Sequence, residues 1–138
     1  MNESDKKDLE IRLKDYLQID DGRIYLACYH SLIEVLNYDI LIFVDEDDWQ
    51  GDSLYLLKNN DKYGLLKFGW GSCSGCDALQ ACESFDDVYT LLNNLNDEII
   101  WFDSKDEINK YLFSKDWDVE YLDKSLVKNF LEECKKIF

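Results

Sequence analysis

Three short apolar runs lie between residues 39 and 70, and the turn-forming residues that separate them limit what this chain can fold into. The runs at residues 39–44, 54–57 and 63–70 are rich in aliphatic and aromatic side chains and have the lengths of β-strands. Aspartate, asparagine and glycine are frequent in the intervals between them, and the chain contains no proline. Since these residues favour tight turns, the region predicts a meander of three antiparallel strands.

Helical patterns precede and follow the meander. Leu9 and Leu13 belong to a three- and four-residue repeat of apolar side chains that predicts an amphipathic helix over residues 4–19. Ser104 followed by Glu107 is a capping-box pattern, which predicts that a helix begins there and continues to about residue 113. Further helices are expected at residues 77–82, 86–95 and 122–136, and a fourth strand at residues 99–102. Residues 24–36 fit a helix or a strand, and their length and apolar spacing favour a helix.

The order of these elements indicates the fold class. Strands followed by helices, rather than a strict alternation of the two, are typical of α+β proteins. A chain of 138 residues is long enough to bury a core without disulfides or metal. We therefore expect a single α+β domain over residues 1–138, with a three- to four-stranded antiparallel sheet covered by helices.

Charge is the strongest compositional signal. The chain has 30 Asp and Glu against 15 Lys and Arg, a formal net charge of −15. Proteins that bind nucleic acid gain affinity by neutralising phosphates with Lys and Arg, so direct nucleic-acid binding is not expected. An anionic surface attracts partners with a basic surface, although it also serves simply to keep a small protein soluble.

The sequence predicts a cytoplasmic protein that does not enter a membrane. It contains no apolar run of the ~18 residues that a membrane span needs, and its first residues are charged where a signal peptide is apolar. The cysteine number is odd, which favours reduced thiols over a disulfide framework. The five cysteines are Cys28, Cys73, Cys76, Cys82 and Cys134.

The most distinctive segment is the turn around Cys73-Ser74-Gly75-Cys76, between an expected strand and an expected helix. A helix N-terminus can stabilise a thiolate in such a pair, but the thioredoxin fold also needs a proline that this chain lacks. Structural zinc is an alternative, with Cys73 and Cys76 as two of the four ligands. The remaining ligands would come from Cys82, or from Cys28 and His30.

Other chemistries fit this sequence less well. The glycine- and serine-rich turn lacks the lysine of a phosphate-binding loop, and Asp77 follows it where the phosphate would lie. Residues 45–56 depart from the calcium-loop pattern, with Gln50 where glycine is needed. His30, the only histidine, has no spacing that pairs it with a nucleophilic cysteine. The cysteine turn is therefore interpreted first as a tight structural corner, and we expect no enzymatic activity.

The run from Gly69 to Gln80, which contains Gly-Ser-Cys-Ser-Gly-Cys-Asp-Ala-Leu-Gln, resembles a group of small acidic proteins of phages and bacteria. Residues 101–104 and 116–117 extend the resemblance, which covers residues 63–120. The resemblance implies no catalytic residue. It does imply a phage or mobile-element context, in which small acidic proteins often bind and block a host protein.

Two functional hypotheses follow. The first is a non-enzymatic protein that docks its acidic surface on a basic partner and imitates nucleic acid, so inhibiting a nucleic-acid-handling host protein. Tryptophan is a common anchor of protein interfaces, and two tryptophans stand among carboxylates here. The expected contacts are Asp45, Glu46, Asp47, Asp48, Trp49, Asp116, Trp117 and Asp118. The alternative is a metal or thiol protein centred on Cys73 and Cys76, with Cys82 as a further ligand and zinc as the cofactor.

Overall fold

The computed structural model describes residues 7–8, 11, 17–20, 23–26, 29–46, 51–71, 79, 81–82, 84–120 and 122–138. Contacts between Cα atoms divide the chain into two compact units. Unit 1 comprises Met1–Asn37 and Cys73–Asp97, and unit 2 comprises Tyr38–Ser72 and Glu98–Phe138. We describe each unit separately, and the expectation of a single domain over residues 1–138 stays a prediction.

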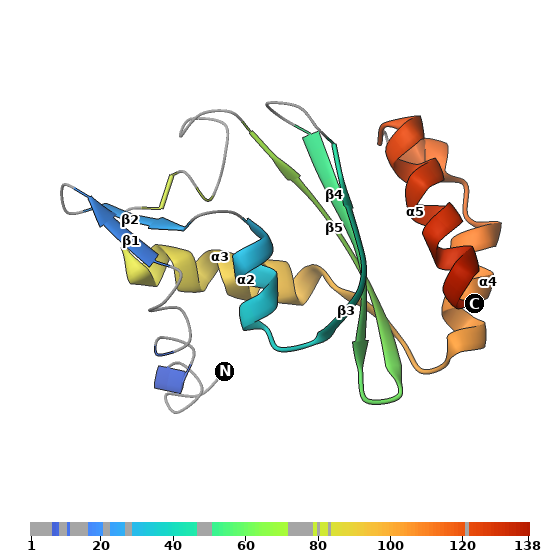
Figure 1. Cartoon of the computed structure of the whole chain (residues 1–138), viewed down its shortest axis with the longest axis horizontal. Helices are drawn as coiled ribbons and strands as arrows, with labels where there is room; N and C mark the ends of the chain where they lie inside the picture. Colours follow the sequence, from blue (N-terminus) through green and yellow to red (C-terminus); the bar gives the residue numbers. More distant parts are fainter. Residues whose placement is uncertain are drawn as a thin grey trace. The chain divides into compact units, whose positions relative to one another are not determined.

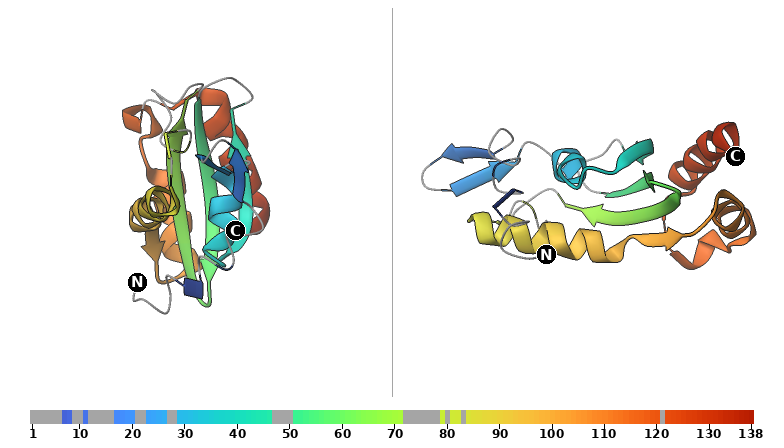
Figure 2. Two further views of the ribbon diagram at one scale, coloured as in Figure 1. Left: turned by 90° about the vertical axis from the view of Figure 1, so that its left-hand side faces the viewer. Right: turned by 90° about the horizontal axis from the view of Figure 1, so that it is seen from below.

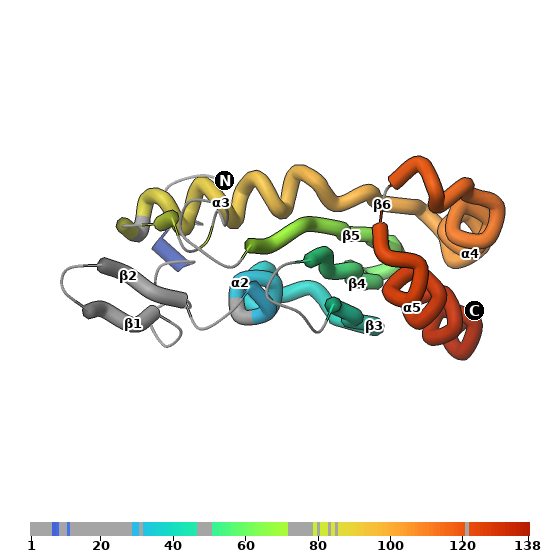
Figure 3. The backbone as a smooth tube through the Cα atoms, turned by 90° about the horizontal axis from the view of Figure 1, so that it is seen from above, coloured from blue at the N-terminus to red at the C-terminus, as the bar shows by residue number. Residues whose placement is uncertain are grey.

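Unit 2 is built on a four-stranded antiparallel sheet in the order β3-β4-β5-β6 (Figure 1; Figure 3). The strands are β3 (Asp39–Asp45), β4 (Gly51–Asn59), β5 (Lys62–Trp70) and β6 (Ile100–Phe102). The structure confirms the predicted meander and fourth strand. The pairing of Asn59 with Lys62 leaves two residues for the β4–β5 turn, where Asn60 adopts a positive φ of 56°, as short hairpin turns require.

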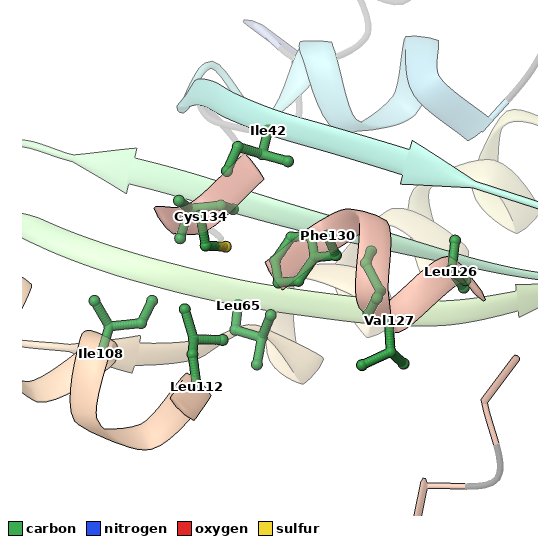
Figure 4. Packing of buried hydrophobic residues seen from close by; sticks show 10 residues of the cluster. Ile42, Leu65, Ile108, Leu112, Leu126, Val127, Phe130 and Cys134 are labelled. Atoms are coloured by element: carbon green, nitrogen blue, oxygen red, sulfur yellow. The ribbon is translucent and has the colours of Figure 1, made fainter. Parts of the chain in front are cut away.

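Helices α4 (Lys105–Ser114) and α5 (Lys124–Ile137) cover one face of this sheet (Figure 2). Alternation along β4 directs Leu54 and Leu56 toward the helices. On α5, Phe130 is completely buried in the same cluster, which also contains Ile42 and Leu65 (Figure 4). The ten buried members of this core are Ile42, Leu54, Leu56, Leu65, Ile108, Leu112, Leu126, Val127, Phe130 and Cys134.

Local hydrogen bonds explain where these two helices begin. Ser104 Oγ accepts from the Glu107 N–H at 3.2 Å, which confirms the predicted cap. The Glu107 carboxylate accepts from the N–H of Asp103 at 3.2 Å, one residue before the cap itself. Asp123 caps α5 by accepting from the Leu126 N–H at 3.0 Å, so this helix begins at Lys124 rather than at residue 122.

The opposite face of the sheet carries a row of aromatic rings. Tyr55 is fully buried, and its ring stacks on Phe43 at 4.6 Å and on Phe68 at 5.9 Å between centroids. The three side chains come from β3, β4 and β5. Both faces of the sheet therefore carry buried apolar side chains, which explains the nearly continuous apolar sequence of β4.

Unit 1 contains a hairpin that the sequence analysis placed in helices. Strands β1 (Leu17–Asp20) and β2 (Arg23–Leu26) pair antiparallel, and they occupy the end of the expected helix 4–19 and the start of the expected helix 24–36. Both predictions were wrong at these positions. Because Asp20 pairs with Arg23, only the dipeptide Asp-Gly separates the strands, and this dipeptide is a strong hairpin signal.

The remaining predictions for unit 1 are partly confirmed. Lys7, Asp8 and Ile11 are helical, α2 (Tyr29–Val35) lies within the expected helix 24–36, and α3 (Phe85–Glu98) contains the expected helix 86–95. The expected helix 77–82 is not helical at its described positions, where residues 79 and 81 form turns. No helix within the described ranges is both long and apolar enough to cross a membrane.

Candidate protein-binding surface

The first expected contact group begins at the end of β3. Asp45 is exposed and pairs with Ser53 of β4. The Glu46 N–H donates to the Asp52 carbonyl at 3.2 Å, and the Glu46 side chain lies against Gly51. The backbone therefore holds both carboxylates at the end of the sheet, while Asp47, Asp48 and Trp49 lie outside the described residues.

A groove of about 440 Å³ runs between edge strand β3 and helix α5. Both charged residues in its lining are glutamates, Glu132 and Glu133. Glu133 Oε1 accepts from Lys136 Nζ at 2.8 Å. Of these two glutamates, Glu132 is therefore the one that forms no ion pair with a described residue. The described lining residues are Leu41, Ile42, Phe43, Val44, Asn129, Glu132 and Glu133. The residues from β3 have apolar side chains and those from α5 include two glutamates, while the accessible surface of the groove as a whole is more polar than apolar.

The second expected contact group, Asp116, Trp117 and Asp118, lies between α4 and α5. Trp117 begins the short 3₁₀ helix η1 (Trp117–Glu120), and its indole Nε1 donates to the Leu112 carbonyl at 2.9 Å. The Asp118 N–H donates to Asp116 Oδ1 at 3.1 Å, and both carboxylates are exposed. The ring is therefore held half-buried against the core, with an acidic residue on each side in the sequence.

An ion-pair cluster that the sequence analysis missed fixes η1 to the sheet. Glu120 is only 16% exposed in its side chain, and its carboxylate binds Lys115 Nζ at 2.7 Å and also Lys67 Nζ. Lys67 belongs to β5, far from Glu120 in the sequence, so no local spacing could have indicated the pair. Glu120 is therefore neutralised within the fold, unlike Asp116 and Asp118, which form no ion pair among the described residues.

The structure describes only part of the expected metal or thiol site. Cys28, Cys73 and Cys76 lie outside the described residues. Cys82 is buried, and its N–H donates to the Leu79 carbonyl at 3.1 Å. His30 Nε2 lies 3.1 Å from Glu34 Oε1, one helical turn further along α2. The described residues contain no cluster of three metal-ligating side chains, and the zinc hypothesis stays a prediction.

Burial controls the chemistry of the remaining described cysteine. Cys134 lies in the core under α5 with a free thiol. Burial, together with the neighbouring Glu133 charge, raises the pKa of this thiol to about 12. Because the thiolate is the reactive form, Cys134 is inert at neutral pH and acts as an apolar packing residue.

No protein-family model, curated protein or solved structure matches this chain. The resemblance to small acidic phage and bacterial proteins therefore stays an expectation.

Proposed function

We propose that this chain is a non-enzymatic binding protein that docks its acidic surface on a basic partner. The observation that carries the proposal is the groove between edge strand β3 and helix α5, which holds two glutamates and no cation among the described residues of its lining. Asp39 and Asp45, both exposed, add a carboxylate at each end of β3. The backbone groups of the edge strand would offer hydrogen bonds to a partner, while the carboxylates would select a partner of opposite charge.

The excess of carboxylates over cations supports the same proposal. With 30 acidic and 15 basic residues, half of the acidic side chains cannot be neutralised within the chain even if every cation were paired. Among the described residues, Asp39, Asp45 and Glu132 form no ion pair. Their charges are available to speed the encounter with a basic surface.

The finer part of the proposal concerns the partner. Proteins that handle nucleic acid carry basic grooves built to neutralise phosphates, and an exposed array of carboxylates can occupy such a groove. We propose that the chain inhibits a partner of this kind by imitating nucleic acid. The resemblance to small acidic phage and bacterial proteins favours a host protein as the target.

A charge-reversal experiment tests the proposal. The tagged protein is used to recover partners from cell extract at low and at high salt, beside a variant with Asp39→Lys and Asp45→Lys. The matched control carries Glu98→Lys and Asp106→Lys, two exposed positions that flank β6 in the sequence, at the opposite edge of the sheet, with the same change in net charge. We expect the β3 variant to lose a basic, salt-sensitive partner that the control retains.

The inhibitory role has its own measurement. The recovered partner is bound to labelled DNA or RNA, and the wild-type protein is added. We expect it to displace the nucleic acid, and the β3 variant to do so much less well. Recovery of the partner that does not depend on salt, or equal loss of the partner in both variants, would contradict binding through the acidic surface along β3. A partner that keeps its nucleic acid in the presence of the protein would contradict the inhibitory role.

A further inference from the structure

A second groove lies on the other side of α5, between this helix and η1, with a volume of about 420 Å³. Its charge differs from that of the groove along β3, because three lysines contribute to its walls. The lining residues are Trp117, Asp118, Leu122, Lys124, Val127, Lys128, Leu131, Glu132 and Lys135. We call this hollow the lysine groove.

The lysines of this groove have no carboxylate partner among the described residues, although the chain has a large surplus of carboxylates. Lys124 and Lys128 form no ion pair with any residue that the structure describes. Lys135 lies 5.8 Å from the ring centroid of Phe113, a cation–π contact that leaves its charge unneutralised. In a chain of net charge −15, the described lining of this groove holds three lysines against two carboxylates, Asp118 and Glu132, so its net charge is weakly positive.

This arrangement is unfavourable for the helix itself. Lys124 and Lys128 are like charges four residues apart, which destabilises a helix by roughly 0.2–0.5 kcal/mol. Lys124 is also the first residue of α5, where the helix dipole favours an anion over a cation, and the capping Asp123 carboxylate supplies that anion. An anionic ligand bound across Lys124 and Lys128 would relieve the repulsion between them.

The chemistry of the other lining residues favours a peptide over a nucleic acid. Trp117, Leu122 and Leu131 offer an apolar surface, which a phosphodiester backbone would not use. Asp118 and Glu132 can accept hydrogen bonds from the N–H groups of a peptide backbone, which a phosphodiester backbone lacks. We propose that the lysine groove binds an extended segment of a partner protein in which acidic and apolar residues alternate. The site goes beyond the acidic surface proposed above, since its ligand has the opposite charge.

The spacing of Lys124 and Lys128 matches such a segment. These two lysines are about 6 Å apart along the helix axis, given a rise of 1.5 Å per residue. Alternate residues of an extended strand are about 6.6 Å apart and point to the same side. Carboxylates at two alternate positions would therefore meet Lys124 and Lys128, while the apolar residue between them would face Trp117. The distance along α5 from Lys124 to Lys135, about 16 Å, accommodates a segment of about five residues.

The test uses the full chain and a defined probe, an acetylated and amidated heptapeptide of alternating Glu and Leu. Binding is followed by ¹H–¹⁵N NMR titration, and we expect shifts confined to the amides of η1 and α5. Lys124→Glu with Lys128→Glu should weaken binding by about tenfold or more, because two ion pairs become repulsive. Glu at the start of α5 suits the helix dipole, but the two introduced glutamates and Glu132 are like charges at four-residue spacing. Circular dichroism is therefore used to check that this variant keeps its fold before binding is measured.

Matched controls separate the groove from bulk charge. Lys105→Glu with Lys110→Glu on α4 makes the same change in net charge away from the groove and should leave the affinity unchanged. Lys124→Arg with Lys128→Arg should also preserve it, and a peptide with Gln in place of Glu should bind much more weakly. Absence of peptide binding at millimolar concentration, or equal losses in the α4 and α5 variants, would overturn the proposal. A single-stranded oligothymidylate that bound more tightly than the peptide would overturn it in favour of nucleic acid.

Discussion

Replacing Gly64 by alanine should destabilise unit 2, because the strand at this position has no room for a methyl group. Gly64 is buried in β5 opposite Trp101 of β6. A Cβ there would lie 2.8 Å from Ile99 Cγ2 and 2.8 Å from Trp101 Cζ3, well inside normal contact. The Trp101 ring is itself restrained by an edge-on contact with Tyr38, at 5.0 Å between centroids.

The expected size of the effect is a balance of two terms. Overpacking of a buried site costs about 1–3 kcal/mol, and the loss of backbone freedom in the unfolded chain returns about 0.4–1 kcal/mol. Gly64→Ala should therefore lower the free energy of unfolding by about 1–2 kcal/mol. Gly69→Ala is the matched control, since its nearest contact is the flexible Asp52 carboxylate at 3.2 Å. It should be neutral or slightly stabilising.

Urea unfolding followed by tryptophan fluorescence measures both variants. A Trp101→Leu background adds a double-mutant cycle, in which the cost of the Gly64 methyl should fall because part of the clash is removed. If Gly64→Ala proves as stable as Gly69→Ala, the claim that β5 and β6 leave no room for a methyl group at Gly64 is wrong. A cost unchanged by Trp101→Leu would assign the clash to Ile99 alone.

Three further predictions concern the core, the buried thiol and a helix cap. Phe130→Ala should lower the free energy of unfolding in urea by about 3–5 kcal/mol, because Phe130 is completely buried. Phe113→Ala should lower it much less, because the Phe113 side chain is 41% exposed. Cys134 should resist an aromatic disulfide reagent at neutral pH until the protein is unfolded, because burial raises the pKa of its thiol to about 12; rapid modification of native protein would contradict this burial. Ser104→Ala should lower the free energy of unfolding by about 1 kcal/mol, because the cap of α4 is lost. Ser104→Asp should keep most of the stability of the wild-type protein, since aspartate also caps helices. Equal stability of all three proteins would show that the cap contributes nothing.

Local signals predicted most of unit 2. The strands of the meander and the cap at Ser104 depend on residues close together in the sequence, where turn chemistry and side-chain capping act directly. The helix expected at residues 122–136 is confirmed as α5, and its side chains Leu126, Phe130 and Cys134 recur at four-residue spacing and are all buried. Leu131 is only partly buried, because it borders the lysine groove.

The same local reasoning failed in unit 1. The apolar repeat that contains Leu9 and Leu13 predicted a helix that continued to residue 19. In the structure, Leu17 pairs with Leu26 across a hairpin. Short apolar runs fit a helix or a strand equally well by periodicity alone, and the pairing of one segment with the other decides between them.

The acidic character of the chain and the strands of its meander were determined by the sequence alone, because composition and turn chemistry need no distant partner. The tertiary structure decided what each charge does. It neutralised Glu120 with Lys67 from another element, left Glu132 unpaired beside β3, and exposed Lys128 next to Trp117. Charges interact over distances of a few ångströms in space, and only the folded chain brings residues so far apart in sequence within that range.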